Sequence, residues 1–319
     1  MKILIVEFIN HHYRRMTNSK QASGLSVCTK MISQSIEAVS RVEVDNLEHI
    51  SQAISLFKPS KVIVEAIKLS PDDFKRLFFK HPKVRFYIHI HSNIPFLTTE
   101  GHSMHRIAEA RDLGVGVLFN DNRSAACFEG SFYLPNIYSA SKYPIKSEPK
   151  NDSLSIVCAG SLRPMKNQVT QALAAIKYGN EVGKKVNFYC NMGRSEGGEE
   201  VKMALKGVFQ FNKNHNLVPI PWFEHKDFLK FLTEMDLGMQ VSLSESFNIV
   251  AADYCYSGLP MVVSSEIRWA SKNVMADTGD VDNIVEKLFT CHKYTEESRE
   301  GLELMNIDAV RRWNDFVEA

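Results

Sequence analysis

A glycine and two cations stand close together in the second half of the chain, directly after an apolar run. The segment AGSLRPMKNQ, residues 159–168, contains Gly160, Arg163 and Lys166 and leads into a stretch with helical periodicity. Cationic side chains beside the N–H groups of a helix N-terminus form a site for an anion, and a diphosphate suits two of them. Ordinary solvated charges would look the same in sequence, but cations at the positive end of a helix dipole are unfavourable without an anion.

Two carboxylates, Glu245 and Asp253, follow a second apolar run, in the segment SLSESFNIVAADYCYSGLPMVV. On one helix they would fall within about 80° of each other, with Glu245 at the helix tip and Asp253 two turns deeper. Ser244 or Ser246 would cap this helix. Three backbone amides after Glu245 would point at an anion: those of Phe247, Asn248 and Ile249. The alternative is structural, with Glu245 complementing the helix dipole and Asp253 solvated.

Two histidines, His89 and His91, lie at and just after the end of the strand-like run VRFYIHI. Side chains two apart on a strand point to the same face, so they match a metal site of the His-x-His type. No carboxylate or third histidine follows at ligand spacing. The sequence therefore favours the absence of a metal, with His89 as a hydrogen-bonded core residue.

The long connection after the first strand, residues 7–31, is basic near its middle and reaches Gly24. Tyr13, Arg14 and Arg15 in this connection are candidates for binding an acceptor, and an ordinary solvated loop is the alternative. The connection lacks the Gly-x-Gly-x-x-Gly fingerprint of dinucleotide-binding folds, which argues against a nicotinamide enzyme.

Short runs rich in valine and isoleucine alternate with stretches of helical period along nearly the whole chain. This alternation is typical of parallel α/β structure. A helix is predicted over residues 70–79, because Ser70 suits its N-cap and Pro71 its first position. The final stretch LELMNIDAVRRWNDFVEA predicts a helix with an apolar face that must pack on something. That face consists of Leu304, Ile307, Val310, Trp313 and Phe316.

A segment rich in serine, lysine and proline interrupts the alternation, which then restarts. We therefore expect two Rossmann-like, doubly wound parallel-sheet domains. The expected parts are an N-terminal acceptor-side domain over 1–140, a linker over 141–152, a C-terminal donor-side domain over 153–300 and a last helix over 301–319 that packs back on the N-terminal domain. Open α/β sheets bind ligands beyond the carboxyl ends of their strands, so we expect the site in turns that face a cleft between the domains.

Composition limits the class of protein. Of the 319 residues, 44% are hydrophobic and 24% are charged, which is enough for two domains with cores. The six cysteines form no Cys-x-x-Cys pair, and no run approaches the ~18 apolar residues of a membrane span. We expect a cytoplasmic protein without a signal peptide. Residues 1–150 have a net charge of +6 and the remainder −5. This charge is too modest to predict nucleic-acid binding, but it suits an anionic or membrane-surface acceptor.

Together the segments 159–168 and 242–263 resemble the retaining GT-B nucleotide-sugar glycosyltransferases, specifically glycosyltransferase family 4. The chain has Gly-x-x-Arg-x-x-Lys-Asn, then Pro-Trp, then Ser-x-x-Glu-Ser-Phe-Asn-Ile-Val and Ser-Gly-Leu-Pro-Met-Val-Val. The family pattern reads Gly-Arg-x-x-x-x-Lys-Gly, then Glu-Gly-Phe-Gly-Leu-x-x-x-Glu-Ala-x-x-x-Gly-x-Pro-Val. The resemblance covers the second half of the chain well and the first half loosely.

The resemblance implies roles for the residues of the second half. Arg163, Lys166 and the turn at Gly160 would bind the donor diphosphate. Glu245 would hold hydroxyls of the transferred sugar, and the amides that follow it would bind sugar or phosphate. Asp253 would hold the ribose, with a carboxylate one methylene shorter than the family's glutamate.

Three further positions follow from the same resemblance. Asn248 stands where the family usually has glycine, and asparagine tolerates a left-handed backbone conformation. His91 matches a histidine beside the reactive carbon of the sugar, which makes it a candidate catalytic residue. Gly24 lies where the family has a glycine pair near the donor phosphate.

The implied activity is transfer of a sugar from a nucleoside-diphosphate sugar, such as a UDP- or GDP-sugar, to a hydroxyl of a glycan, lipid-linked or small-molecule acceptor. The anomeric configuration would be retained by front-face substitution, in which the leaving phosphate oxygen takes the proton of the acceptor. No cofactor or metal is expected, because cations and helix N-termini would stabilise the leaving diphosphate. Two alternatives are a nucleotide-sugar epimerase on the same fold and an inactive module that binds a nucleotide or a partner.

Overall fold

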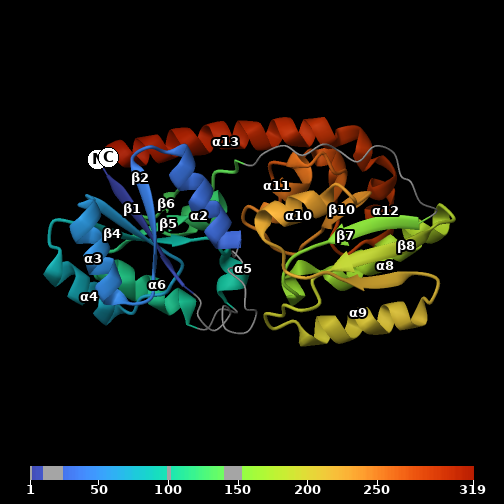
Figure 1. The fold of residues 1–319 in the computed structure, drawn as a ribbon, viewed down its shortest axis with the longest axis horizontal. Coiled ribbons are helices and arrows are strands. Elements are labelled where there is room, and N and C mark those ends of the chain that lie inside the picture. The colour runs from blue at the N-terminus through green and yellow to red at the C-terminus, as the bar shows by residue number, and fades with distance from the viewer. Residues whose placement is uncertain (1, 10–23, 99–101, 140–152) are drawn as a thin grey trace. The chain divides into compact units, whose positions relative to one another are not determined.

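The computed structural model describes residues 2–9, 24–98, 102–139 and 153–319. The chain forms two compact units, each built on a six-stranded parallel sheet (Figure 1). Unit 1 consists of Met1–Ser139 and Asn306–Ala319, and unit 2 consists of Ala140–Met305. The expected α/β class with two doubly wound parallel sheets is confirmed.

The sheet of unit 1 has the strand order β2-β1-β3-β4-β5-β6. Its strands are β1 (Ile3–Phe8), β2 (Val39–Val44), β3 (Lys61–Glu65), β4 (Arg85–Ile90), β5 (Gly116–Phe119) and β6 (Phe132–Tyr133). Alternate side chains of β1 enter two different hydrophobic cores, Leu4 and Val6 one core and Ile3 and Ile5 the other. Both faces of the sheet are therefore covered, which explains why its strands are nearly continuous apolar runs.

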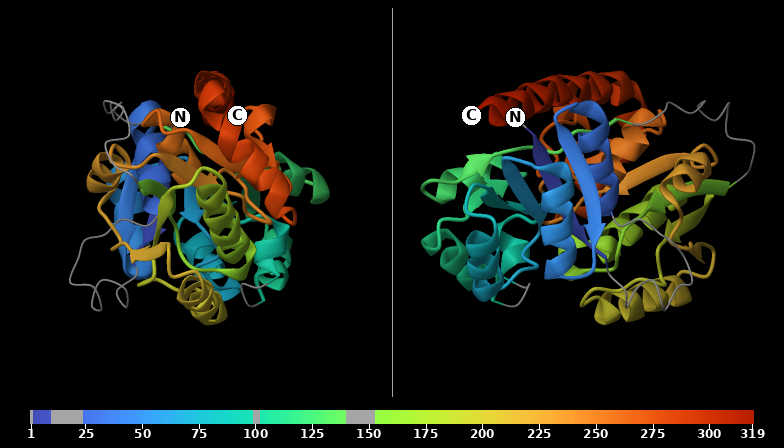
Figure 2. Two further views of the ribbon diagram at one scale, coloured as in Figure 1. Left: turned by 90° about the vertical axis from the view of Figure 1, so that its right-hand side faces the viewer. Right: turned by 60° about the vertical axis from the view of Figure 1, so that its left-hand side comes forward.

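Helices of unit 1 pack on both of these cores. Figure 2 shows the ribbon from two further sides. Those packed on the core of Leu4 are α3 (Leu47–Phe57), α4 (Pro71–Lys80), α5 (Ile94–Leu97), α6 (Ser103–Asp112) and α7 (Asn122–Cys127). Those packed on the core of Ile3 are α2 (Gly24–Ser35) and the end of α13 (Thr295–Glu318).

Helix α4 begins as its sequence predicts. Ser70 is the N-cap and Pro71 the first helical residue. The hydroxyl of Ser70 accepts a hydrogen bond from the amide of Asp73 at 3.2 Å, and the Asp73 carboxylate accepts one from the amide of Ser70 at 3.0 Å. This reciprocal capping box satisfies two of the N–H groups that a helix start leaves unpaired.

The last helix, α13, is longer than expected and buries only part of the predicted face. Trp313 of that face is buried, and Val310 and Phe316 pack against the same core. Leu302, Trp313 and Val317 are buried, whereas Leu304 and Ile307 are 68% and 67% exposed. The expectation that Leu304 and Ile307 pack is therefore wrong. A residue two positions after Leu302 is turned by about 200° around the helix axis, and so points away from the core.

The C-terminal end of α13 is held by a buried lysine of unit 1. Lys61 is 1% exposed, and its ammonium donates hydrogen bonds to the carbonyls of Phe316 and Val317. A cation at this position complements the negative end of the helix dipole. Asn306 adds two hydrogen bonds to the backbone of Tyr138, at 2.9 and 2.8 Å.

The sheet of unit 2 has the strand order β12-β11-β10-β7-β8-β9. Its strands are β7 (Ser153–Cys158), β8 (Lys185–Cys190), β9 (Asn216–Pro219), β10 (Leu237–Gln240), β11 (Met261–Ser264) and β12 (Met275–Ala276). Its α-helices, besides the start of α13, are α8 (Gln168–Glu181), α9 (Glu199–Phe211), α10 (His225–Leu232), α11 (Ile249–Tyr256) and α12 (Val281–Thr290). Its 3₁₀ helices are η1 (Pro164–Lys166), η2 (Lys272–Val274) and η3 (Cys291–Tyr294).

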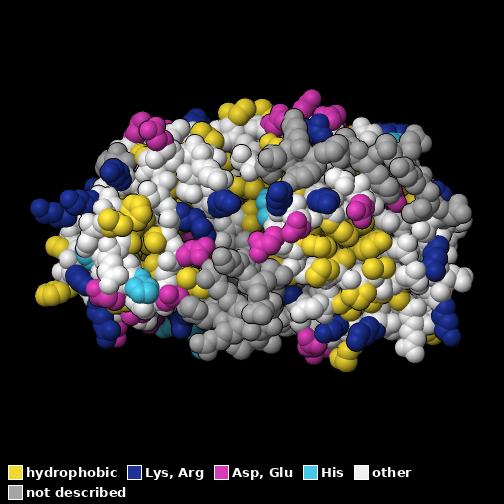
Figure 3. Space-filling view, viewed as in Figure 1, with side chains coloured by type: hydrophobic (Ala, Val, Ile, Leu, Met, Phe, Trp, Pro, Cys, Tyr) yellow, Lys and Arg dark blue, Asp and Glu magenta, His cyan; other side chains and the backbone are white. Residues whose placement is uncertain are grey.

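Two observations bear on the expected anionic or membrane-surface acceptor. No helix within the described ranges has both the length and the apolar character that crossing a bilayer requires. On the face shown in Figure 3, acidic and basic side chains of the described residues are interspersed.

Candidate functional site

The turn after β7 requires a glycine. Gly160 has φ +120°, a conformation that residues with a Cβ rarely adopt. Its amide donates a hydrogen bond to the side-chain oxygen of Asn191 at 2.8 Å, and the neighbouring Ala159 amide donates to the hydroxyl of Tyr254 at 3.0 Å. These bonds fix the first part of the turn to the loop after β8 and to α11.

The next part of this turn pairs with the loop after β8. The amide of Leu162 donates to the carbonyl of Arg194 at 2.9 Å, and the Glu196 amide donates to the carbonyl of Leu162 at 3.0 Å. Glu196 forms ion pairs with both Arg163 and Arg194. Arg163 is therefore paired with a carboxylate that the sequence analysis did not predict as a site residue.

Lys166 lies at the end of η1 and connects the two segments singled out in the sequence. Its ammonium forms an ion pair with the carboxylate of Glu245, and both side chains are mostly buried, at 17% and 7% exposed. Asn167, which has a left-handed backbone, donates to the carbonyl of Val241 at 3.1 Å. The amide of Leu243 in turn donates to the carbonyl of Met165 at 2.9 Å.

Helix α11 begins later than expected. Its N-cap is Asn248, whose side chain accepts a hydrogen bond from the Ala251 amide at 2.9 Å. The expectation that Ser244 or Ser246 caps the helix is therefore wrong, and Glu245 precedes the helix instead of standing on its first turn. The three amides expected to face an anion belong to Phe247, Asn248 and Ile249. Phe247 precedes the helix, Asn248 is its N-cap, and Ile249 is its first residue.

Asn248 has the left-handed conformation that its sequence context suggested, with φ 58° and ψ 85°. Its side-chain amide donates to the oxygen of Gln240 at 2.9 Å, which ties the cap to the end of β10. Phe247 is 5% exposed, and its carbonyl accepts a hydrogen bond from the indole of Trp269 at 2.9 Å.

Asp253 is buried on α11 and is 2% exposed, so it is not a solvated helix residue. Its carboxylate oxygen accepts a hydrogen bond from Nε2 of His225, at 2.7 Å. His225 is the first residue of α10. Because α11 begins at Ile249, Asp253 stands about one turn into the helix, and not two.

The strand order explains why the two turns meet. After β7 the chain adds β8 and β9 on one side of β7, then returns to its other side with β10. Open α/β sheets bind ligands at such a switch point, beyond the carboxyl ends of the two strands. The turns that follow β7 and β10 at this point carry Arg163, Lys166 and Glu245.

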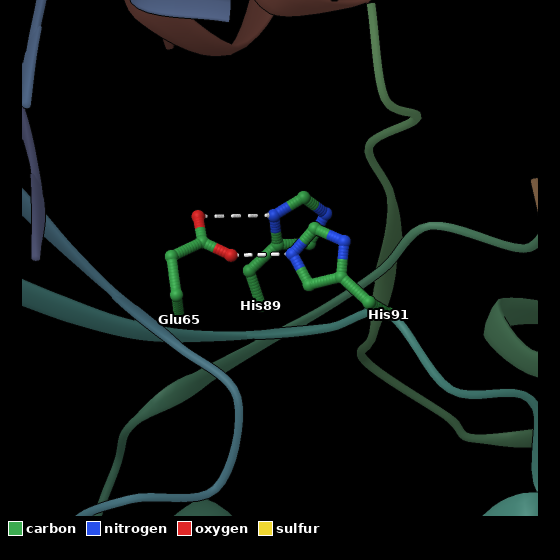
Figure 4. Close-up of side chains that lie close together, drawn as sticks. All are labelled: Glu65, His89 and His91. Atoms are coloured by element: carbon green, nitrogen blue, oxygen red, sulfur yellow. Dashed lines mark hydrogen bonds and ion pairs between the residues drawn. The ribbon is translucent and has the colours of Figure 1, made fainter. Parts of the chain in front are cut away.

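In unit 1, Glu65 at the end of β3 meets His89 of β4 and His91, which directly follows β4 (Figure 4). Its carboxylate lies 3.4 Å from Nδ1 of His89 and is hydrogen-bonded to Nε2 of His91. Burial acts to raise the pKa of Glu65, but the charges and hydrogen bonds of the two histidines outweigh it and lower the pKa to about 2. Burial and the charge of His89 lower the pKa of His91, against the attraction of Glu65.

Glu65, His89 and His91 form the one group of metal-ligand side chains found among the described residues, with ligand atoms within 4.8 Å of one another. No carboxylate follows these histidines at ligand spacing in the sequence, but Glu65, which precedes them, pairs with His89 on the neighbouring strand. The geometry is that of a hydrogen-bonded cluster. The three ligand atoms are also close enough together to share a zinc ion, which binds at about 2.0–2.2 Å from each ligand.

The structure describes only one of the other site residues predicted for unit 1. Gly24 is the first residue of α2. Tyr13, Arg14 and Arg15 lie outside the described residues. A second buried carboxylate, Glu7 at the end of β1, is paired with Arg41.

The buried thiols of unit 2 are poor nucleophiles. Burial raises the pKa of Cys190 to about 12 and that of Cys158 well above its ordinary value. A thiol reacts as its thiolate, so neither group is activated for covalent chemistry.

No family model matches the sequence, and no curated protein matches it. Solved structures do. A sucrose-phosphate synthase from Thermosynechococcus elongatus matches with a TM-score of 0.72 and 9% identity, over 99% of this chain and 98% of that one. A UDP-forming α,α-trehalose-phosphate synthase from Burkholderia xenovorans, in complex with glucose-6-phosphate, matches with 0.68 and 11%, over the whole of both chains. The chain has the GT-B fold.

A third GT-B structure is a variant of S. aureus TarM in complex with fondaparinux, alpha-GlcNAc-glycerol and UDP. It matches with a TM-score of 0.60 and 14% identity, over 95% of this chain. This chain spans only 60% of the length of that one.

Sequence reasoning missed four polar side chains that contact the expected site residues. They are Glu65, Glu196, His225 and Glu266, the last of which accepts a hydrogen bond from the Glu245 amide at 3.4 Å. For Glu65 a signal was present, since it ends the run KVIVE next to the strand that carries the histidines. The other three contacts depend on how loops and helices pack.

Proposed function

We propose that the protein transfers a sugar from a nucleoside-diphosphate sugar to a hydroxyl acceptor. The observation that carries this proposal is the meeting of two turns at the switch point of the unit 2 sheet. There Lys166 forms an ion pair with Glu245, three residues before the N-cap of α11. Arg163 precedes Lys166 in the same turn and pairs with Glu196. Cations and helix amides suit a diphosphate, and carboxylates suit sugar hydroxyls.

In this proposal Arg163 and Lys166 bind the donor diphosphate. Both are paired with carboxylates, Glu196 and Glu245. Negative charge grows on the leaving diphosphate as the glycosidic bond breaks. Cations already held at that point stabilise it without reorganisation. Donor binding would transfer part of the Lys166 contact from Glu245 to phosphate, which leaves Glu245 available to the sugar hydroxyls.

Asp253 is proposed for the ribose hydroxyls. Its hydrogen bond to His225 holds the carboxylate in one orientation. The turn at Gly160 and the amides at Asn248 and Ile249 complete the donor site.

Two contributions from unit 1 rest on the sequence resemblance alone. His91 is proposed to act near the reactive carbon, and Tyr13, Arg14 and Arg15 are proposed to bind the acceptor.

We further propose that the anomeric configuration is retained. The bond between the anomeric carbon and the phosphate oxygen breaks, the acceptor oxygen bonds to that carbon from the same face, and the acceptor proton passes to the leaving phosphate. The raised pKa values of the buried thiols agree with a reaction that forms no covalent link to a cysteine. NMR of the product tests this through the configuration of the new linkage.

The solved structures support UDP as the nucleotide. One is described as UDP-forming and another is in complex with UDP. One contains glucose-6-phosphate and another a glycerol-linked sugar, which supports a hydroxyl acceptor.

A thermal-shift screen with UDP-, GDP-, ADP- and TDP-sugars tests the donor site. A ligand that binds only the native state at 100 times its Kd stabilises it by about 2.7 kcal/mol, so one nucleotide should raise the Tm clearly. Lys166→Ala and Arg163→Ala should abolish that shift. Lys177→Ala is the matched control, because this lysine lies on α8 and pairs with Asp282 at the surface.

Incubation of the stabilising donor with and without acceptors separates the activities. Release of nucleoside diphosphate with a glycosylated acceptor supports transfer, and it should persist after chelation with EDTA. Conversion of the donor into its epimer without an acceptor would identify an epimerase. Binding without turnover across a broad acceptor panel would identify a binding module and contradict the proposal.

A further inference from the structure

Gln171 is a buried polar residue of α8 that the proposed donor site does not use. It is 0% exposed, and the other buried residues of this helix are mostly small or apolar. Burying an amide side chain costs free energy unless its polar atoms have hydrogen-bond partners. The partners of Gln171 therefore indicate what the residue does.

The side-chain amide of Gln171 bonds to three segments at once. Its Nε2 donates to the carbonyl of Lys166 at 2.7 Å, and its Oε1 accepts from the amide of Val241 at 2.9 Å. The thiol of Cys158 also donates to Oε1, at 3.6 Å, so both acceptor positions of this oxygen are used. Gln171 therefore joins the end of β7, the end of η1 and the residue that follows β10.

A second side chain spans the same two turns. Asn167 donates to the carbonyl of Val241 at 3.1 Å and to the carbonyl of Thr278 at 2.8 Å. The backbone of Val241 is thus held on both sides, its amide by Gln171 and its carbonyl by Asn167. The turn after β7 and the turn after β10 are therefore fixed to each other at the switch point of the sheet.

These bonds determine where Lys166 stands relative to Glu245. Lys166 follows β7 and Glu245 follows β10, so the two side chains meet only while the two turns keep a fixed separation. A lysine carries its charge on a flexible four-carbon stem, and its ammonium has a defined place only when its backbone is fixed. Gln171 fixes that backbone directly, at the carbonyl of Lys166.

We propose that Gln171 is a positioning residue of the donor site, which holds the backbone of Lys166 against the end of β10 and so places the ammonium for the donor diphosphate. A cation placed in advance stabilises the diphosphate without reorganisation. The contact to the diphosphate rests on the proposed function, but the placement of Lys166 relative to Glu245 does not. The alternative is that Gln171 contributes to stability alone.

The first experiment measures UDP binding by calorimetry in wild type, Lys166→Met, Gln171→Met and the double variant. Methionine is close to glutamine in length and volume, so Gln171→Met removes the hydrogen bonds with little change in packing. With Gln171 present, Lys166→Met should weaken UDP binding by about 30-fold, as for loss of a hydrogen bond to a charged group. With Gln171→Met, the same change should cost less than about fivefold. An equal loss in both backgrounds would overturn the proposal, because a role in stability alone leaves the two effects additive.

The second experiment needs no ligand and measures the coupling of Lys166 to Glu245 through stability. Urea unfolding of Lys166→Met, Glu245→Gln and their combination gives this coupling as a factor in the unfolding equilibrium constant. We expect a factor of about 30 with Gln171 present, within the range for residues in contact, and of less than about five with Gln171→Met. An unchanged factor would overturn the proposal.

Gln171→Asn is the second variant if Gln171→Met does not fold. Asparagine keeps the amide but is one methylene shorter, so it cannot reach both Lys166 and Val241. Both the loss of UDP binding caused by Lys166→Met and the stability coupling should fall below about tenfold in this background. Wild-type values of both would overturn the proposal.

His215→Leu is the control for a buried polar residue of unit 2. His215 precedes β9, and its Nδ1 accepts a hydrogen bond from the amide of Val186 at 3.0 Å, near the start of β8. The variant leaves a buried amide without its acceptor, as Gln171→Met does, but at the amino ends of the strands. It should lower stability and leave both factors unchanged. A fall like that in Gln171→Met would refute a specific role for Gln171.

The two experiments also separate this proposal from the proposed function. If UDP does not bind to the wild-type protein, GDP, ADP and TDP are titrated in its place. Failure of all four nucleotides contradicts the proposed donor site, while the unfolding experiment still decides whether Gln171 positions Lys166. Binding with additive losses refutes the positioning role and leaves the donor site intact.

Discussion

Replacing Lys166 by methionine leaves the carboxylate of Glu245 without its cation in a site where that side chain is only 7% exposed. Removing one partner of a fully buried pair costs about 3–5 kcal/mol. The lysine is 17% exposed, so water can partly solvate the site, and we expect a loss of about 3 kcal/mol. Glu245→Gln leaves the more exposed ammonium near an amide oxygen, and should cost about 2 kcal/mol.

The double variant decides whether the pair exists in solution. With both charges removed, no unpaired ion remains, so the total loss should be about 3 kcal/mol instead of the sum of about 5 kcal/mol. The difference is a coupling of about 2 kcal/mol, within the range for residues in contact. Urea unfolding followed by circular dichroism measures all four proteins. The exposed pair of Lys177 and Asp282 is the control, and its Lys177→Met variant should change stability by less than about 1 kcal/mol.

Activity should respond differently from stability in the same four proteins. Each single variant should lose about 10²–10³-fold in kcat, because a preorganised contact to the transition state is gone. The double variant should stay inactive although it should be no less stable than Lys166→Met alone. Additive stability losses would refute the ion pair, and a double variant with wild-type turnover would refute the donor site.

The remaining predictions concern the nucleotide, the cap and pH. Calorimetry with the bare nucleoside diphosphate should show Asp253→Ala weaker by about 1–3 kcal/mol and Glu245→Ala nearly unchanged, and equal losses would contradict the division of roles. Asn248→Gly should cost less stability than Asn248→Ala, since alanine loses the cap and strains the left-handed backbone by about 1–2 kcal/mol, which thermal unfolding measures. The pKa of Glu65 falls from 4.5 to about 2 on folding. The contribution of the ionised Glu65 to the free energy of unfolding should therefore be complete above pH 4.5 and disappear as the pH falls towards 2. The gap in unfolding free energy between wild type and Glu65→Gln should narrow over that interval.

The sequence allowed prediction of those features that depend on local pattern. The cap at Ser70 follows from residues three apart, and the left-handed Asn248 follows from a position where the resembled family has glycine. The alternation of apolar runs and helical stretches predicted two parallel sheets, and the ordered motifs predicted the GT-B fold.

Features that depend on register and packing were not predicted. Glu65 and His89 are paired across β3 and β4, and nothing local specifies which residues of two strands lie opposite each other. His225 reaches Asp253 from another helix, 28 residues away. Of the face predicted for α13, Val310, Trp313 and Phe316 pack in unit 1. Leu304 and Ile307 are exposed instead, because apolar spacing alone does not specify how much of a helix face meets a partner.

The three tryptophans stand in three different environments, and each can serve as an optical reporter of its own segment. Trp222 lies under the guanidinium of Arg194, which is 4.1 Å from the ring centre. Trp269 donates its indole proton to the carbonyl of Phe247, next to the cap of α11, and Trp313 is fully buried in unit 1 with its indole bonded to Pro135. Replacing two of the three by phenylalanine would make fluorescence specific to one segment. A donor that occupies the switch point should then change the emission of Trp222 or Trp269, while Trp313 reports separately on the core of unit 1.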